Sequence, residues 1–157
     1  MQPPSETVVA AWIGLLRAQA FAFGEIERAV RDAGLPKLEW YDVLWELERG
    51  GPLRPRDLQA RLLFAQYNLS RLFDRMEAAD LITRDACPED NRGQLISITD
   101  QGRKLRRRMW LTYGPAIDAA IKGRLTEEEA GLLATLLSKL APKPAGPTGD
   151  PLTKRQT

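Results

Sequence analysis

The fold of this chain is decided by residues 67–76, which read YNLSRLFDRM. Four apolar side chains recur there at the spacing i, i+3, i+4 and i+7, which puts them on one face of an α-helix: Leu69, Leu72, Phe73 and Met76. The residues between them are polar and face outward: Tyr67, Asn68, Ser70, Arg71 and Arg75. Their side chains are donors of the kinds that contact base edges and phosphates. We therefore expect an amphipathic reading helix over residues 66–79 that inserts into DNA.

Three helices are predicted before the reading helix. The first runs from about residue 7 to residue 33 and is stopped by Gly34 and Pro36, because glycine accepts a left-handed cap and proline cannot continue the hydrogen-bond ladder. The second buries an apolar face and ends at the Gly50-Gly51-Pro52 turn. A short third helix over residues 55–63 completes a helix-turn-helix arrangement with the reading helix.

A β-hairpin is predicted after the reading helix. Strands are expected at residues 81–85 and 94–99, where Ile96 and Ile98 share one face by the two-residue period of a strand. Residues 87–93 between the strands are charged and rich in turn formers. We expect them to form a tip that can reach a DNA groove.

The remaining helices carry more apolar surface than one chain easily covers. A long helix begins near Asp100, and the last helix begins at the capping box Thr126-x-x-Glu129. That last helix carries five leucines on one face, while the first helix has a heptad-like apolar seam that includes Trp12 and Leu16. Because large exposed apolar patches mark interfaces, we expect a homodimer. The alternative is that the two faces pack on each other within a monomer.

Composition narrows the function classes. The 157 residues suit one protomer, and twelve basic residues against eight acidic ones between residues 54 and 108 place the basic excess around the reading helix. With no histidine and one cysteine, the chain lacks the commonest residues of zinc and proton-transfer chemistry, so we expect no catalytic residue, metal or cofactor. We expect no membrane-spanning helix, because no apolar run approaches the length of about 20 residues that a span needs. The start lacks signal-peptide features, which predicts a cytoplasmic protein without membrane contact.

In its order of elements and in its motifs, nearly the whole chain resembles the MarR family of bacterial transcriptional regulators. The resemblance rests on Leu58 through Leu62, on residues 67–77, on the motif Asp90-x-Arg92 and on residues 98–105, ITDQGRKL. One departure is Asp80, which stands where a helix-ending glycine is usual and must adopt the left-handed conformation at some cost.

The resemblance implies a mainly α fold with a small two-stranded β wing in a single protomer, residues 1–157. A winged helix-turn-helix lobe would cover residues 36–108. A helical dimerisation lobe would combine residues 1–35 with residues 109–141 and interleave with its partner's across a two-fold axis. Residues 142–157, rich in proline and glycine, are expected to form a disordered tail.

The implied function is a sequence-specific repressor that binds double-stranded DNA as a homodimer on a pseudo-palindromic operator. Asn68 suits adenine and Arg71 suits guanine in the major groove. Arg92 on the wing suits a narrow groove or paired phosphate oxygens, and Asp90 would hold it by a charge-assisted hydrogen bond. The expected DNA contacts are Gln66, Tyr67, Asn68, Ser70, Arg71, Arg75, Arg92, Arg54 and Arg56.

Three of these contacts have structural alternatives. Tyr67 can cap the reading helix or stack on a sugar, and Arg75 can pair with Asp74 or Glu77 on the helix surface. Arg92 can belong to an ordinary surface ion pair with Asp90. Cys87 is expected to be accessible on the wing, without a redox role.

An effector and a second function class stay open at this point. Six aromatic residues either belong to the core or line a pocket for a small aromatic ligand that releases the DNA: Trp12, Trp40, Tyr41, Trp45, Trp110 and Tyr113. The alternative function is a winged-helix protein-interaction module without specific DNA binding.

Overall fold

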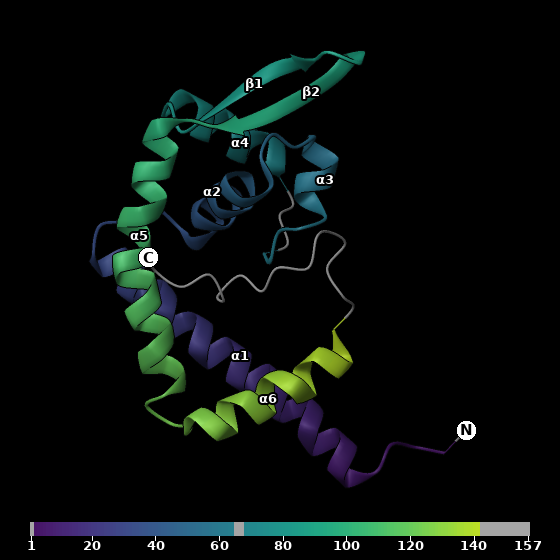
Figure 1. Ribbon diagram of the computed structural model, residues 1–157. Helices are drawn as coiled ribbons and strands as arrows, with labels where there is room; N and C mark the ends of the chain where they lie inside the picture. Colours follow the sequence, from purple (N-terminus) through teal and green to yellow (C-terminus); the bar gives the residue numbers. More distant parts are fainter. Residues whose placement is uncertain (1, 65–67, 142–157) are drawn as a thin grey trace. The chain divides into compact units, whose positions relative to one another are not determined.

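The computed structural model describes residues 2–64 and 68–141, with the backbone alone at Asn91 and Arg92 (Figure 1). The predictions for Gln66, for Tyr67 and for the tail at 142–157 lie outside these residues, as does the side chain of Arg92. The chain is mainly helical with one two-stranded antiparallel sheet, which confirms the predicted fold class. Its contacts divide it into two compact units, residues 1–38 with 107–132, and residues 39–106 with those from 133 onward.

The second unit is built around one apolar core. Its elements are α2 (Leu38–Gly50), α3 (Pro55–Gln59), α4 (Leu69–Ala78), β1 (Ile82–Cys87) and β2 (Asp90–Ile98). The predicted apolar face of the reading helix, α4, is confirmed, since Leu72, Phe73 and Met76 are buried and Leu69 packs half-buried against the core. The other core residues come from α2, α3, the two strands and the segments that precede β1 and α3: Val43, Leu44, Leu47, Leu53, Leu58, Leu81, Ile82, Ile96 and Ile98.

The ends of α4 are fixed by two different caps. The helix begins at Leu69 and not at Gln66, because the Asn68 side chain accepts a hydrogen bond from the Arg71 amide and caps it there. At the other end Asp80 has φ +56°, the left-handed conformation that the sequence predicts, and the Leu81 amide donates to the Met76 carbonyl at 3.0 Å. The Thr99 hydroxyl donates to the Asp80 carbonyl at 2.6 Å and ties this turn to the end of β2.

Helix α3 is shorter than predicted. It ends at Gln59, whereas the sequence pattern predicts helix as far as Leu63. The physical reason lies outside the segment, because the amides of Leu63 and Phe64 donate to the Asp42 carboxylate of α2 and not to carbonyls one helical turn back. The residues before Asn68 are therefore held by a side chain that no local pattern signals.

The wing, β1 and β2 with their turn, extends further than predicted. Its register runs from the pair Ile82 and Ile98 to the pair Cys87 and Asp90, with an irregularity after Ala86. Only Pro88 and Glu89 separate the strands, so the expected seven-residue tip was wrong. Figure 1 shows the hairpin at the edge of its unit, with the tip directed away from α4.

A third segment joins the sheet at the root of the wing. Leu53, in the connection between α2 and α3, forms a bridge with Ile96, with N···O distances of 3.0 and 2.8 Å. The sequence did not signal it, because a single paired residue has no strand periodicity.

The first unit contains α1 (Glu6–Asp32) and most of α5 (Asp100–Ile121). The predicted stop after α1 is confirmed, since Gly34 has φ +67° and the Leu35 amide donates to the Val30 carbonyl. The Arg124 guanidinium lies 4.6 Å from the centre of the Phe21 ring, which links α1 to the segment after α5.

Helix α6 (Glu127–Leu140) begins at the predicted capping box. The Glu129 amide donates to the Thr126 hydroxyl at 3.2 Å, and the Thr126 amide donates to the Glu129 carboxylate at 2.9 Å. Its leucines and the apolar residues of α1 are exposed: Val8, Val9, Trp12, Ile13, Leu16, Phe21, Leu132, Leu133, Leu136, Leu137 and Leu140.

Helix α1 corrects one expectation. An 18-residue window in it has a mean hydropathy of 1.4, so by length and composition it could cross a membrane, although no apolar run of that length was expected. The reason is that Arg17 is the one charged residue between Glu6 and Glu25, so small and apolar residues surround the helix on nearly every side. None of that window is buried in the protomer. Exposed apolar surfaces of this size usually mark interaction sites.

Gly102 at the start of α5 should not tolerate a side chain. A Cβ there would lie 2.3 Å from the Leu81 carbonyl oxygen and 2.8 Å from the Ile98 side chain. We expect Gly102→Ala to lower the free energy of unfolding by about 1 to 3 kcal/mol, because the nearest atom belongs to the backbone. Urea denaturation would measure it, with the exposed neighbour Gln101→Ala as the control. Equal stability of the two variants would contradict this packing.

Candidate nucleic-acid interface

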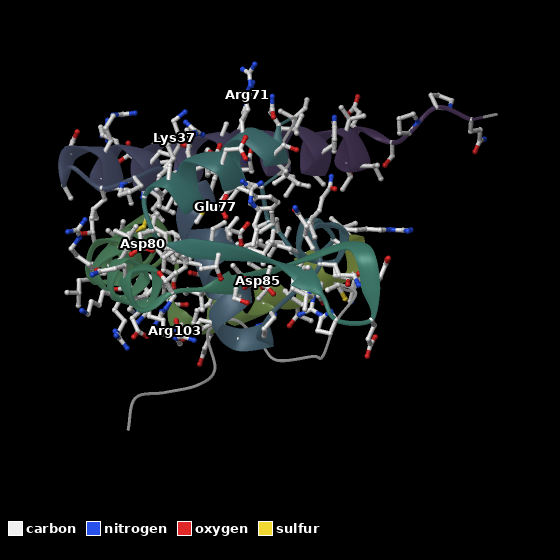
Figure 2. The ribbon with its side chains drawn as sticks, turned by 90° about the horizontal axis from the view of Figure 1, so that it is seen from above. Lys37, Arg71, Glu77, Asp80, Asp85 and Arg103 are labelled. Atoms are coloured by element: carbon white, nitrogen blue, oxygen red, sulfur yellow. The ribbon has the colours of Figure 1, made fainter. Side chains whose placement is uncertain are left out.

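The outward face of α4 presents polar side chains where the sequence predicts them. Asn68, Ser70, Arg71 and Arg75 are exposed on the side opposite the buried stripe. Figure 2 shows the Arg71 side chain directed away from the ribbon. Within residues 2–64 and 68–141, neither Arg71 nor Arg75 forms an ion pair. Both guanidinium groups are thus presented to solvent on a rigid helix.

Asn68 combines two tasks. Its Oδ1 accepts a hydrogen bond from the Arg71 amide at 3.2 Å, so the oxygen is engaged in capping α4. A bidentate contact with adenine uses the same oxygen and the amide N–H groups together. Asn68 can therefore donate freely, but it can accept from a base only by sharing the oxygen with the cap.

Arg84 of the wing forms ion pairs with two carboxylates of α4. Arg84 of β1 donates to the Asp74 carboxylate at 2.7 Å and to the Glu77 carboxylate at 2.9 Å. The hydrogen bonds that Arg84 donates to these carboxylates, above all to Glu77, raise the pKa of Arg84. The carboxylates predicted as partners of Arg75 are thus occupied by Arg84, whose single positive charge offsets one of their two negative charges. Figure 2 shows Glu77 on the side of α4 toward the hairpin.

The start of α3 is joined to the far end of the wing. Arg54, at the N-cap of α3, lies 3.8 Å from the Asp90 carboxylate and donates to the Cys87 sulfur at 3.5 Å. Asp90 was predicted to hold Arg92, whose side chain lies outside the described residues, and in the structure Asp90 contacts Arg54. Arg56 is exposed on the same short helix. Two of the predicted phosphate contacts therefore lie on α3, and one of them also braces the wing.

Cys87 corrects a second expectation. It is 6% exposed, although the sequence predicts an accessible thiol. The reason is that strand pairing continues as far as Cys87, and both Arg54 and Gly93 lie against its side chain. Its burial suits a structural thiol at the base of the turn.

A buried carboxylate lies under the turn that leads into α4. Asp42 is 3% exposed, and its Oδ2 accepts from the Leu63 amide at 2.6 Å and the Phe64 amide at 3.3 Å. Burial raises the pKa of Asp42 to about 6, while the two backbone hydrogen bonds act in the opposite direction. Sequence reasoning missed this residue. The available signal is that Leu38, Asp42 and Glu46 lie at i, i+4 spacing on one side of α2, so the two acids continue an apolar line.

Comparisons with known proteins agree with this geometry. Residues 33–93 match the sequence model of the MarR family. Over 139 residues the chain is 28% identical to the HTH-type transcriptional regulator YkoM of Bacillus subtilis, covering 86% of this chain and 89% of that protein. The crystal structure of Sco3205, a MarR family transcriptional regulator from Streptomyces coelicolor, superimposes with a TM-score of 0.77 at 26% identity, covering 89% of both chains. The chain is therefore similar to the MarR family, whose sequence model it matches over residues 33–93.

A second curated relative points the same way. The chain is 28% identical over 102 residues to the multiple antibiotic resistance protein MarR of Salmonella typhimurium, covering 65% of this chain and 71% of that protein. MarR proteins are DNA-binding transcriptional regulators with a winged helix-turn-helix. The predicted resemblance is confirmed, and the family is one of regulators and not of enzymes.

The six aromatic residues of the sequence prediction are divided between the two units. In the second unit Tyr41 stacks on Trp45 with ring centres 6.4 Å apart, and the Arg106 guanidinium lies 5.3 Å from the centre of the Trp45 ring. Trp40 packs half-buried on the core of that unit. In the first unit Trp110 meets Tyr113 edge-on, and Trp12 is 59% exposed.

A shallow hollow of about 390 Å³ in the first unit is lined by none of the six aromatic residues. Its lining combines the turn after α1 with the middle of α5: Ala33, Gly34, Leu35, Arg108, Leu111 and Thr112. The aromatic pocket stays a prediction.

Asp42 should make the stability of the protein fall as the pH rises from about 4 to about 6. Its pKa is about 6 in the folded chain, against 3.8 for an ordinary aspartate. In this window the folded state therefore binds more protons than the unfolded state, and each unit of rising pH lowers the free energy of unfolding. The total loss is of the order of 3 kcal/mol.

The measurement is urea denaturation of the wild type and of Asp42→Asn at several pH values. Because asparagine does not titrate, the wild type should lose stability relative to the variant between pH 4 and pH 6, with a constant difference above about pH 7. Parallel curves across the window would contradict a raised pKa.

Proposed function

We propose that this MarR-family protein is a sequence-specific transcriptional repressor that binds a pseudo-palindromic operator as a homodimer. The observation that carries the proposal is the outward face of α4, where exposed donors stand on a helix capped at both ends. Because such a helix is already ordered, it would lose little conformational entropy on entering the major groove. Sco3205, 26% identical to this chain, was crystallised in complex with DNA, which supports the same role here.

The proposed contacts follow from this placement. Ser70 and Arg71, in the first turn of α4, would face base edges, with Arg71 directed at guanine. Arg75 would contact a phosphate one turn further along the helix. Arg92 would enter the minor groove from the wing, and the remaining proposed contacts are Gln66, Tyr67, Asn68, Arg54 and Arg56.

A homodimer is supported by the exposed apolar residues of α1 and α6. A window of α1 long enough to span a membrane has no buried residue, and the leucines of α6 are exposed. A second copy of the chain would cover these faces, with residues 1–35 and 109–141 as the dimerisation lobe and residues 36–108 as the DNA-binding lobe. A cytoplasmic location, away from the membrane, follows from a role on bacterial DNA.

A small aromatic effector is the proposed means of release. The indole N–H of Trp45 is buried and has no acceptor among the described residues, beside the aromatic ring of Tyr41. An effector with an aromatic ring and an acceptor oxygen would suit that environment. It could release DNA only by binding one spacing of the two DNA-binding lobes better than the other.

The test of the function is selection of bound duplexes from a random DNA library. We expect a palindrome with half-sites roughly 10 base pairs apart. The selected duplex should bind at least about 10³-fold more tightly than a scrambled one at the same salt concentration. Equal and weak binding to both duplexes would favour the alternative, a winged-helix module that binds a protein.

Substitution of Arg71 and substitution of Arg92 should change DNA affinity in different ways. Arg71→Ala removes a base contact, so we expect the selected duplex to lose about 1 to 3 kcal/mol of binding free energy and the scrambled duplex to lose little. Arg92→Ala removes a backbone or groove contact, so both duplexes should weaken and the salt slope should flatten by about 0.9.

Titrations at two or more salt concentrations would separate these effects. Arg31→Ala is the matched control, because Arg31 is an exposed arginine in the last turn of α1. Unchanged affinity and slope for Arg92→Ala would remove the wing from the proposed interface.

A further inference from the structure

One carboxylate of α2 binds the backbone of residues 63 and 64, which follow α3. Asp42 Oδ2 accepts hydrogen bonds from two successive amides, Leu63 at 2.6 Å and Phe64 at 3.3 Å. Hydrogen bonds to an ionised acceptor are roughly twice as strong as those between neutral groups. These two bonds determine where the chain runs after α3, since α3 itself ends at Gln59.

The position of this turn matters because α4 begins within a few residues of it. Phe64 lies four residues before Asn68, the cap of α4, and the cap bond of Asn68 is local to its own helix. The apolar side of α4 is held by the core, but contacts of this kind allow small sliding movements along the helix axis. The Asp42 bonds act near the N-terminal end of α4, which is the end that would carry the base contacts.

Stability alone does not account for an acid at this position. Asp42 is 3% exposed, and its neighbours Val43 and Leu44 are fully buried in the apolar core. Burying a carboxylate costs free energy even when it is hydrogen-bonded, and an apolar side chain would often pack there at lower cost. The raised pKa of Asp42, about 6, reflects that cost.

Glu46 provides a comparison within the same helix. It is 5% exposed, one turn after Asp42, and its carboxylate accepts from Arg49 at 3.1 Å. No hydrogen bond joins Glu46 to residues 63 and 64 within the part of the chain that the structure describes. Of these two buried acids, Asp42 is the one that reaches the turn.

We propose that Asp42 is a positioning residue for DNA sequence recognition. Its carboxylate sets the place of the N-terminal end of α4 in the groove and so sharpens the discrimination between operator and other DNA, without touching DNA. The inference rests on the proposed function of α4.

The test compares four full-length variants on the selected operator and on a scrambled duplex. Asp42→Asn keeps an acceptor oxygen at the same distance. Asp42→Leu keeps the volume and removes the acceptor, and Asp42→Glu keeps the charge but moves it by one methylene. Glu46→Gln is the control, a buried acid changed one turn away.

We expect the ratio of operator to scrambled affinity to fall about 10-fold to 100-fold in the Leu and Glu variants, because neither keeps an acceptor oxygen within hydrogen-bond distance of the two amides. Scrambled-duplex affinity and its salt slope should stay unchanged, since non-specific binding depends on charge at the surface. The Asn variant and the Glu46→Gln control should keep the ratio within about 3-fold. Melting temperatures of all variants would be recorded in parallel.

A folded Leu variant with an unchanged ratio would overturn the proposal, as would equal losses on both duplexes. If the Leu variant does not fold, the Glu variant decides between the same two outcomes. Leu63 is 71% exposed, so the freed amides can turn to water and leave the fold in place. A wild type without operator preference would instead refute the proposed function, and the two failures are therefore distinguishable.

Discussion

The burial of one face of α4 is the constraint on which the rest of this protein depends. Leu72, Phe73 and Met76 pack into the core of the second unit together with residues of α2 and the strands. Because a helix has 3.6 residues per turn, fixing three side chains on one side also fixes the direction of every side chain on the other. This packing directs Arg71 and Arg75 outward, so no contact made by the two arginines themselves is required to expose them. A loose core would leave the same residues with no defined direction.

Polar contacts between elements fix the relative positions of α2, α4 and the wing more narrowly than apolar packing alone would. Arg84 ties the wing to α4 through Asp74 and Glu77, Asp42 ties α2 to the turn before α4, and Leu53 ties the α2–α3 connection to Ile96. Each contact joins segments that are distant in sequence, and each acts on a different side of α4 or the wing. Apolar packing is not directional, whereas hydrogen bonds have defined lengths and angles. The core therefore holds the lobe together, and these bonds set its register.

The first unit, unlike the second, exposes a large apolar surface. Its helix α1 contains a long apolar stretch with no buried residue, and α6, which is divided between the two units, exposes its leucines. The proposed homodimer would cover this excess, since a regulator that reads both halves of a palindrome needs two copies of its reading helix. The same covering surface would join the two copies and set the spacing between them.

The sequence by itself determined the elements whose signals are local. The apolar spacing of α4, the capping box of α6, the glycine stop after α1 and the left-handed Asp80 were all predicted, and with the wing motif they identify the family. Tertiary structure alone decided where α3 ends, how far the wing pairs and that Cys87 is buried. It also decided that Asp42 binds the amides of Leu63 and Phe64 and that Arg84 binds two carboxylates of α4. Periodicity and capping depend on neighbours within about one helical turn or one strand repeat, so a sequence displays them directly. The partners of Asp42 and Arg84 lie on other elements, and only the folded chain brings them within hydrogen-bond distance.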